Sequence, residues 1–229
     1  MKKLISSIIF ALFLTLPAMS EINVGVSTNI VGFYGEGTET ETNNDGTKTL
    51  TQSAGAFEEN FNSVFVEYDA GSVILGVSYS PETIETPKNT NLQNNAENKN
   101  AKSKNNTVKA EFENLMSIYA IVPTPLFGFY GKVGYTMADI TTLELLETGG
   151  SYADTDTTGL SAGFGYEHSI ENFFVRLEAL ATFYDDVELD NINKQQPLSG
   201  NGAGETTAKK IKVEEMMSAN ATLSVGYSF

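Results

Sequence analysis

The 229-residue chain has 29 aspartate and glutamate residues against 14 lysine and arginine residues, and its formal net charge is −15. This acidic balance disfavours a nucleic acid partner, because phosphate backbones attract clustered basic residues. The chain has no cysteine, which excludes disulfides and thiolate sites as a source of stability.

The beginning of the chain has the three parts of a secretory signal peptide. Two lysines follow the initial methionine, residues 4–16 are apolar, and small residues precede an expected cleavage site after Ser20. The apolar run is shorter than the roughly 20 residues that a membrane-spanning helix needs. We therefore expect a cleaved signal peptide, residues 1–20, and one mature domain, residues 21–229.

Eight segments of the mature domain alternate apolar and polar side chains, which is the period of a β-strand with two different faces. In chain order they cover approximately 22–30, 62–69, 73–80, 107–121, 128–139, 158–167, 173–184 and 217–229. The last segment is the clearest, because the odd positions from Met217 to Phe229 are apolar and the even positions between them are small or polar. One face of each strand therefore suits lipid, and the other suits a polar lumen.

The connections between these segments alternate in length. Short connections fall near 69–72, 122–127 and 168–172, and long polar connections fall near 35–61, 81–106, 140–157 and 185–212. In outer-membrane barrels the periplasmic turns are short and the extracellular loops are long. Three short and four long connections therefore fit eight strands with both termini in the periplasm.

We predict an all-β fold, namely a transmembrane antiparallel up-and-down β-barrel of eight strands with four long extracellular loops and three short periplasmic turns. Ten strands are the alternative if residues 141–151 form an extra hairpin. The leucines at Leu143, Leu145 and Leu146 do not alternate cleanly, which argues against that hairpin.

Two features resemble a known protein family. Leu223, Val225, Tyr227 and Phe229 alternate up to the last residue, as in the C-terminal signal that the barrel assembly machinery reads. Residues 128–135 and 159–167 look like strands of the small outer-membrane barrels that include OmpX, the OmpA barrel and opacity-like surface proteins. The resemblance implies the outer membrane of a Gram-negative bacterium, with membrane lipid, lipopolysaccharide and the assembly machinery as partners. It implies no cofactor and selects no activity.

Charged residues on the predicted lumen faces are the main candidate site. They are Glu67, Lys109, Glu111, Glu113, Lys132, Glu167, Arg176 and Glu178. An eight-stranded barrel is only just wide enough for its own side chains, and a buried charge needs a partner. We expect a salt-bridged plug, and the alternative is a narrow gated pore whose charges select ions.

Two other patterns suggest chemistry. His168 and Ser169 resemble a catalytic pair, but adjacent strand residues point to opposite faces and the pair lies at a predicted periplasmic turn. Acidic residues at Asp154, Asp156, Asp185, Asp186, Glu188 and Asp190 are of the type that binds Ca²⁺ or Mg²⁺, although such runs are more often solvated. We therefore predict neither a catalytic nor a metal site, and no enzyme activity.

The function expected from the sequence is structural and surface interaction, in envelope integrity, adhesion or recognition. A monomeric barrel would present acidic loops, and those loops would bind any extracellular ligand. The alternatives are a narrow ion or small-solute channel and an outer-membrane enzyme that modifies lipid. A soluble secreted β-protein is countered by the lipid-facing stripes and by Phe229.

Overall fold

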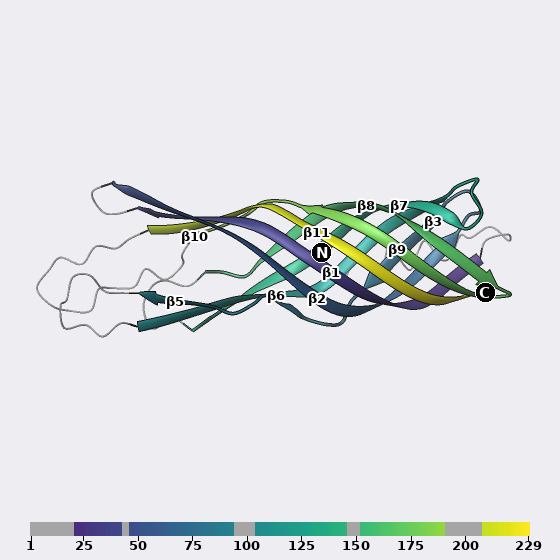
Figure 1. Cartoon of the computed structure of the whole chain (residues 1–229), viewed down its shortest axis with the longest axis horizontal. Helices are drawn as coiled ribbons and strands as arrows, with labels where there is room; N and C mark the ends of the chain where they lie inside the picture. The colour runs from purple at the N-terminus through teal and green to yellow at the C-terminus, as the bar shows by residue number, and fades with distance from the viewer. Residues whose placement is uncertain (1–20, 43–45, 94–103, 146–151, 191–207) are drawn as a thin grey trace, which may run out of the picture.

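A computed structural model describes residues 21–42, 46–93, 104–145, 152–190 and 208–229, and the expected signal peptide lies outside them. These residues form one antiparallel sheet that winds around a long cylinder (Figure 1). Its strands are β1 (Glu21–Thr42), β2 (Lys48–Asp69), β3 (Ile74–Tyr79), β4 (Ile84–Glu85), β5 (Asn89–Gln93), β6 (Lys104–Pro123), β7 (Phe129–Leu145), β8 (Thr155–Ile170), β9 (Phe173–Tyr184), β10 (Val187–Asp190) and β11 (Ala208–Ser228).

The sheet closes into a ring because β1 pairs with β2 on one side and with β11 on the other. Around the ring the order is β1, β2, β3, β6, β7, β8, β9 and β11. β4 and β5 pair with β6 beyond the end of β3, and β10 pairs with β11 beyond the end of β9. The predicted eight-stranded antiparallel barrel is therefore confirmed.

The two ends of the barrel differ. Three short turns and the C-terminus lie at one end, which we call the turn end, and the longer connections lie at the other, the loop end (Figure 1). Gly71 and Gly128 have positive φ in two of the turns, and Glu171 does in the third. Such values of φ are the ones that tight connections require.

The predicted first long loop, residues 35–61, is mostly strand. β1 and β2 pair residue by residue from Glu21 and Asp69 up to Thr42 and Lys48. Threonine favours extended backbone, and the ladder satisfies the backbone polar groups. The sequence hides this hairpin because neither of its faces carries a continuous apolar stripe.

The other predicted long loops also contain strand. Residues 81–106 include β4 and β5, and residues 185–212 include β10 and the start of β11. Within residues 140–157, β7 runs on to Leu145 against β6. Residues 141–145 therefore continue an existing strand, and the ten-stranded alternative is wrong for the part of the chain that is described.

Two strands contain a β-bulge. β6 has one extra residue against β7 between Glu113 and Met116, and β11 has one against β1 opposite Tyr34 and Glu36. Asn114 and Glu215 have φ values of 53° and 51° at these points, as expected for a residue inserted in a bulge. Such an insertion moves every later side chain to the opposite face.

The bulge in β6 contradicts part of the sequence prediction. On the loop side of the bulge, Phe112 points into the barrel and stacks on Phe33, with ring centroids 5.9 Å apart. Lys109, Glu111 and Glu113 have the opposite phase and lie on the outer wall. The prediction that these three residues face the lumen is therefore wrong. The apolar and polar residues of β6 alternate in the sequence on both sides of the bulge, so the sequence gives no sign of the inserted residue.

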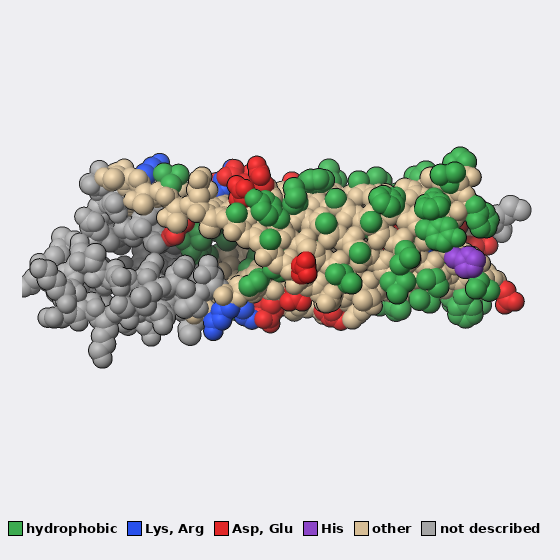
Figure 2. Space-filling model, in the orientation of Figure 1, with side chains coloured by type: hydrophobic (Ala, Val, Ile, Leu, Met, Phe, Trp, Pro, Cys, Tyr) green, Lys and Arg blue, Asp and Glu red, His purple; other side chains and the backbone are tan. Residues whose placement is uncertain are grey.

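The outer surface near the turn end is apolar. Exposed hydrophobic side chains gather over this half of the cylinder, whereas most charged side chains on the same face lie nearer the loop end (Figure 2). Leu160 and Phe164 of β8 are about two-thirds exposed, at 67% and 66%. At the turn end, Tyr227 contacts both Phe173 and Phe229 edge to face. Within the described residues, no helix has the length and apolar character needed to cross a membrane.

Candidate functional site

The lumen near the turn end is packed by four pairs of a glycine and an aromatic ring. Directly paired residues of neighbouring strands form each one, and together they involve all eight strands of the ring. The pairs are Gly25 with Phe65, Gly76 with Tyr119, Gly165 with Tyr130, and Gly226 with Phe174. A Cβ atom at any of these glycines would collide with the ring, so glycine is what lets the rings lie against the wall.

Arg176 lies at the centre of this packed region. Its Nη1 donates to Glu67 Oε1 at 2.5 Å, and its Nε donates to Glu167 Oε2 at 2.6 Å. The side chains of Arg176 and Glu67 are 3% and 0% exposed. The guanidinium carbon is also 4.3 Å from the centre of the Phe174 ring, a cation–π contact.

Two neutral side chains complete the hydrogen bonding of Glu67. Tyr119 donates its hydroxyl to Oε1 at 2.8 Å, and Asn23 donates its amide to Oε2 at 3.3 Å. A buried carboxylate is stable only when its lone pairs are satisfied. Four groups from four strands, namely Asn23, Glu67, Tyr119 and Arg176, thus meet across the lumen.

A second ion pair lies beside the first. Lys132 Nζ is 2.9 Å from Glu178 Oε2, and Tyr130 donates its hydroxyl to Glu178 Oε1 at 2.8 Å. The Lys132 ammonium lies 4.0 Å from the centre of the Tyr119 ring, which links the two ion pairs. Three carboxylates and two cations therefore share the lumen.

The structure brings together five of the eight charged residues selected from the sequence: Glu67, Lys132, Glu167, Arg176 and Glu178. The sequence analysis missed Tyr119, Tyr130 and Asn23. A signal for the tyrosines exists, since each has the lumen phase of its strand and faces a glycine on the next strand.

Lys109 and Glu111 form a separate group on the outer wall. Lys109 Nζ is 2.8 Å from Glu85 and 2.9 Å from Glu111. Its hydrogen bonds to Glu85 and Glu111 raise the pKa of Lys109, and the hydrogen bond from Lys109 lowers the pKa of the Glu85 carboxyl. These are surface ion pairs of the loop end and lie outside the lumen.

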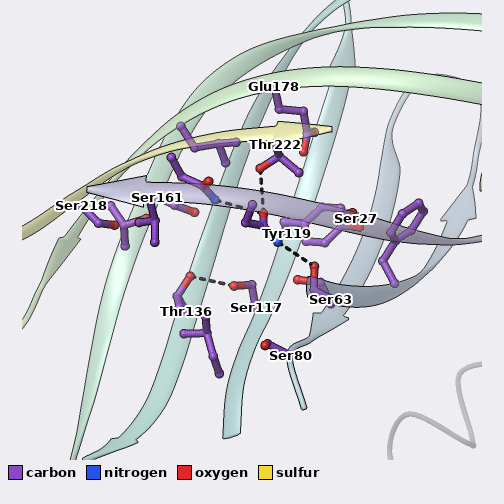
Figure 3. Close-up of a pocket in the computed structure, with 18 of the residues that line it drawn as sticks. Ser27, Ser63, Ser80, Ser117, Tyr119, Thr136, Ser161, Glu178, Ser218 and Thr222 are labelled. Carbon is purple, nitrogen blue, oxygen red and sulfur yellow. Dashed lines mark hydrogen bonds between the residues drawn. The ribbon is translucent and has the colours of Figure 1, made fainter. Parts of the chain in front are cut away.

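Small polar side chains line the lumen next to the charged cluster, toward the loop end (Figure 3). Ser27 and Ser224 share a 2.8 Å hydrogen bond, as do Ser117 and Thr136, and Thr222 donates to the Asn29 side chain at 2.9 Å. The cavity among these side chains has a volume of about 100 Å³. We call this layer the hydroxyl collar, and it leaves room for a few water molecules only.

The structure does not assemble a catalytic pair at His168 and Ser169. His168 is exposed, and Ser169 donates its hydroxyl to Glu167 at 2.8 Å. The two residues pair with Val175 and Phe174 at the turn end of β9. In the pair considered from the sequence, His168 would have to be the base within hydrogen-bond reach of Ser169, and the contact of Ser169 is with Glu167.

Three of the acidic residues considered as metal ligands have other contacts. Asp186 lies 3.2 Å from Lys212, and Glu188 pairs with Lys210. Asp185 accepts the hydroxyl of Thr158. No group of three or more candidate metal ligands is found in the described part of the chain.

Comparisons with known proteins relate this lumen and its wall to a known architecture. No family model and no curated protein matches the sequence. The outer membrane protein OprG from Pseudomonas aeruginosa matches the structure with a TM-score of 0.51 at 11% identity, over 92% of this chain and 96% of that one. The chain has the fold of small outer-membrane β-barrels.

Two further solved structures are similar at lower scores. Neisserial surface protein A matches at a TM-score of 0.35 and 11% identity, over 87% of this chain and 97% of that one. The outer membrane protease OmpT from Escherichia coli matches at 0.43 and 11% identity, over 94% and 99%. The match to OprG confirms the predicted resemblance to small outer-membrane barrels as a fold, and opacity-like proteins are not singled out.

Proposed function

We propose that the protein spans the bacterial outer membrane as a non-conducting barrel whose loop end faces outside and serves surface interaction. The observation that supports a closed barrel is the contact of buried Arg176 on β9 with Glu67 on β2, two strands that are not neighbours in the ring. Side chains of non-neighbouring strands meet there at hydrogen-bond distance, which supports a lumen without a continuous aqueous path.

The position in the membrane follows from the outer surface. Lipid favours exposed apolar side chains, and the belt near the turn end supplies them. Beyond the bulges the outer wall carries charged residues such as Glu113 and Lys212, which lipid tails disfavour. The loop end therefore projects out of the bilayer.

The proposed role at the surface uses this projecting part. The hairpin of β1 and β2 extends to Thr42 and Lys48, well past the last apolar residues of the outer belt, and its strands carry threonine and glutamate. We propose recognition or envelope support by such hairpins and no enzymatic activity. The hydrogen bond of Ser169 to Glu167 leaves the candidate pair His168 and Ser169 unassembled, which supports the latter.

Planar-bilayer recording tests the closed lumen. We expect the refolded wild-type protein to give no conductance steps. The double variant Glu67→Ala with Arg176→Ala removes both members of the central pair and should open a measurable conductance.

The matched control is Glu85→Ala with Lys109→Ala, which removes an ion pair of the outer wall and should stay silent. Reproducible, charge-selective steps from the wild-type protein, altered by Lys132→Ala, would overturn the proposal in favour of a narrow channel. Folding of every variant is checked beforehand by the heat-dependent gel shift of barrels.

A further inference from the structure

The barrel reverses its pattern of polarity along its length. Near the turn end the lumen is polar and the outer wall is apolar. On the loop side of the bulges, Phe112 of β6 and Val213 of β11 face inward, while their neighbours Glu113 and Lys212 face outward. This part of the barrel has the polarity of a water-soluble β-barrel, with an apolar interior.

On the side of the turn end, this apolar interior is bounded by a compact apolar cluster. Val31, Phe61 and Ile84 are buried at 3%, 7% and 2% exposure, and Phe33, Phe57 and Phe112 pack against them. The Phe33 ring stacks on that of Phe57 with centroids 4.9 Å apart. This cluster separates the interior of the loop end from the hydroxyl collar.

A cavity of about 590 Å³ lies next to this cluster, inside the loop end. Aromatic, aliphatic and thioether side chains form most of its wall, including Phe33, Phe57, Phe112, Ile140, Val213 and Met216. Among the described residues that line it, Lys88 is the one charged side chain. We call this cavity the apolar chamber.

We propose that the apolar chamber binds one small, uncharged apolar molecule. Its volume lies within the roughly 300–1,000 Å³ of small-molecule sites, which are mainly apolar and aromatic, and eight-stranded barrels are wide enough to hold one small ligand. The acidic outer wall and the net charge of −15 disfavour anions. The site lies outside the proposed bilayer belt, so the molecule enters from the aqueous side of the loop end.

Tryptophan fluorescence tests the proposal, because the chain has no native tryptophan. The variant Phe112→Trp places one indole in the chamber, and Phe183→Trp places one on the lipid-facing wall. Each is reconstituted in phospholipid nanodiscs and titrated with 1-bromooctane, which quenches indole on contact. We expect saturable quenching for the chamber reporter and only a linear, partition-limited decrease for the lipid reporter.

A pair of variants on β6 supplies the control. Adding Ala110→Leu to the chamber reporter fills the cavity and should raise the half-saturation concentration at least about tenfold, whereas Ala120→Leu on the outer face should leave it unchanged. Linear quenching at both reporters, or no effect of Ala110→Leu, would overturn the proposal. If Phe112→Trp does not fold, Phe57→Trp serves as the chamber reporter with the same two outcomes.

Discussion

At the scale of single residues, the ion pairs in the lumen are buried, so removing one partner of a pair costs free energy. Arg176 neutralises Glu67, which is almost fully buried, and also contacts Glu167. A buried ion pair adds little stability compared with apolar packing, but the loss of one member leaves an uncompensated charge. The pair therefore fits the proposed closure of the lumen better than a role as a source of stability.

The first prediction concerns this asymmetry. Arg176→Met should lower the free energy of unfolding by about 3–5 kcal/mol, because Glu67 stays buried without a cation. Lys109→Met removes a cation with two carboxylate contacts on the outer wall and should change stability little. Urea unfolding of the refolded proteins in lipid vesicles measures both, and equal losses would contradict this account.

The glycines that face aromatic rings give a second prediction at this scale. Gly76→Ala places a methyl group against the Tyr119 ring and should cost about 1–3 kcal/mol, the usual range for overpacking. Gly131→Ala is the matched control, because nothing lies within 4 Å of the Cβ built there. If both variants unfold at the same urea concentration as the wild-type protein, the rings do not depend on glycine.

At the scale of the strand, the two bulges decide which side chains face inward. Each bulge inserts one residue, with Asn114 in β6 and Glu215 in β11 at positive φ. The positions that face inward therefore shift by one residue where the apolar belt of the outer wall gives way to charged residues. In the other strands of the ring the same alternate positions face inward along the whole length, and the character of the inward side chains changes instead. In β7 the inward positions pass from Lys132 and Thr136 to Ala138 and Ile140.

Cysteine labelling checks the phase change, since the chain has no native cysteine. In the folded protein, Glu113→Cys should react readily with a bulky polyethylene-glycol maleimide, because position 113 lies on the outer wall. Phe112→Cys should react only after unfolding, because position 112 faces the interior. The reverse order of reactivity would mean that β6 alternates without a bulge.

At the scale of the whole molecule, the barrel is two structures on one sheet. One half has an apolar outer wall around a polar lumen that contains ion pairs, and the other half has a charged outer wall around an apolar interior. The closed ring satisfies the backbone along both halves, so the change of surroundings needs no second domain. In the proposed orientation, the same eight strands anchor the protein in the membrane and extend beyond it at the cell surface.

The proposed orientation gives a prediction at this scale. In intact cells, Gln52→Cys at the loop end should be labelled by a membrane-impermeant maleimide. Asn172→Cys at the turn end should be labelled only after the outer membrane is permeabilised. Labelling of Asn172→Cys alone in intact cells would place the turn end outside and refute the orientation.

The sequence alone determined the antiparallel barrel, its eight strands and their outward faces near the turn end, because lipid on one side and a lumen on the other impose a period of two. It also selected Glu67, Lys132, Glu167, Arg176 and Glu178, which the structure brings together. Their partners Tyr119 and Tyr130 followed only from the strand register, which pairs residues far apart in the chain.

Only the tertiary structure decided where the apolar side chains of the barrel change from the outer face to the inner face. The bulges at Asn114 and Glu215 appear as one extra residue relative to the neighbouring strand. The sequence of one strand does not show how many residues of the neighbouring strand pair with it. The sequence also did not reveal the long β1–β2 hairpin. In the proposed position beyond the membrane, no lipid requires its strands to carry an apolar stripe. Alternation reports the surroundings of a strand, whereas pairing with its neighbours sets which way each side chain faces.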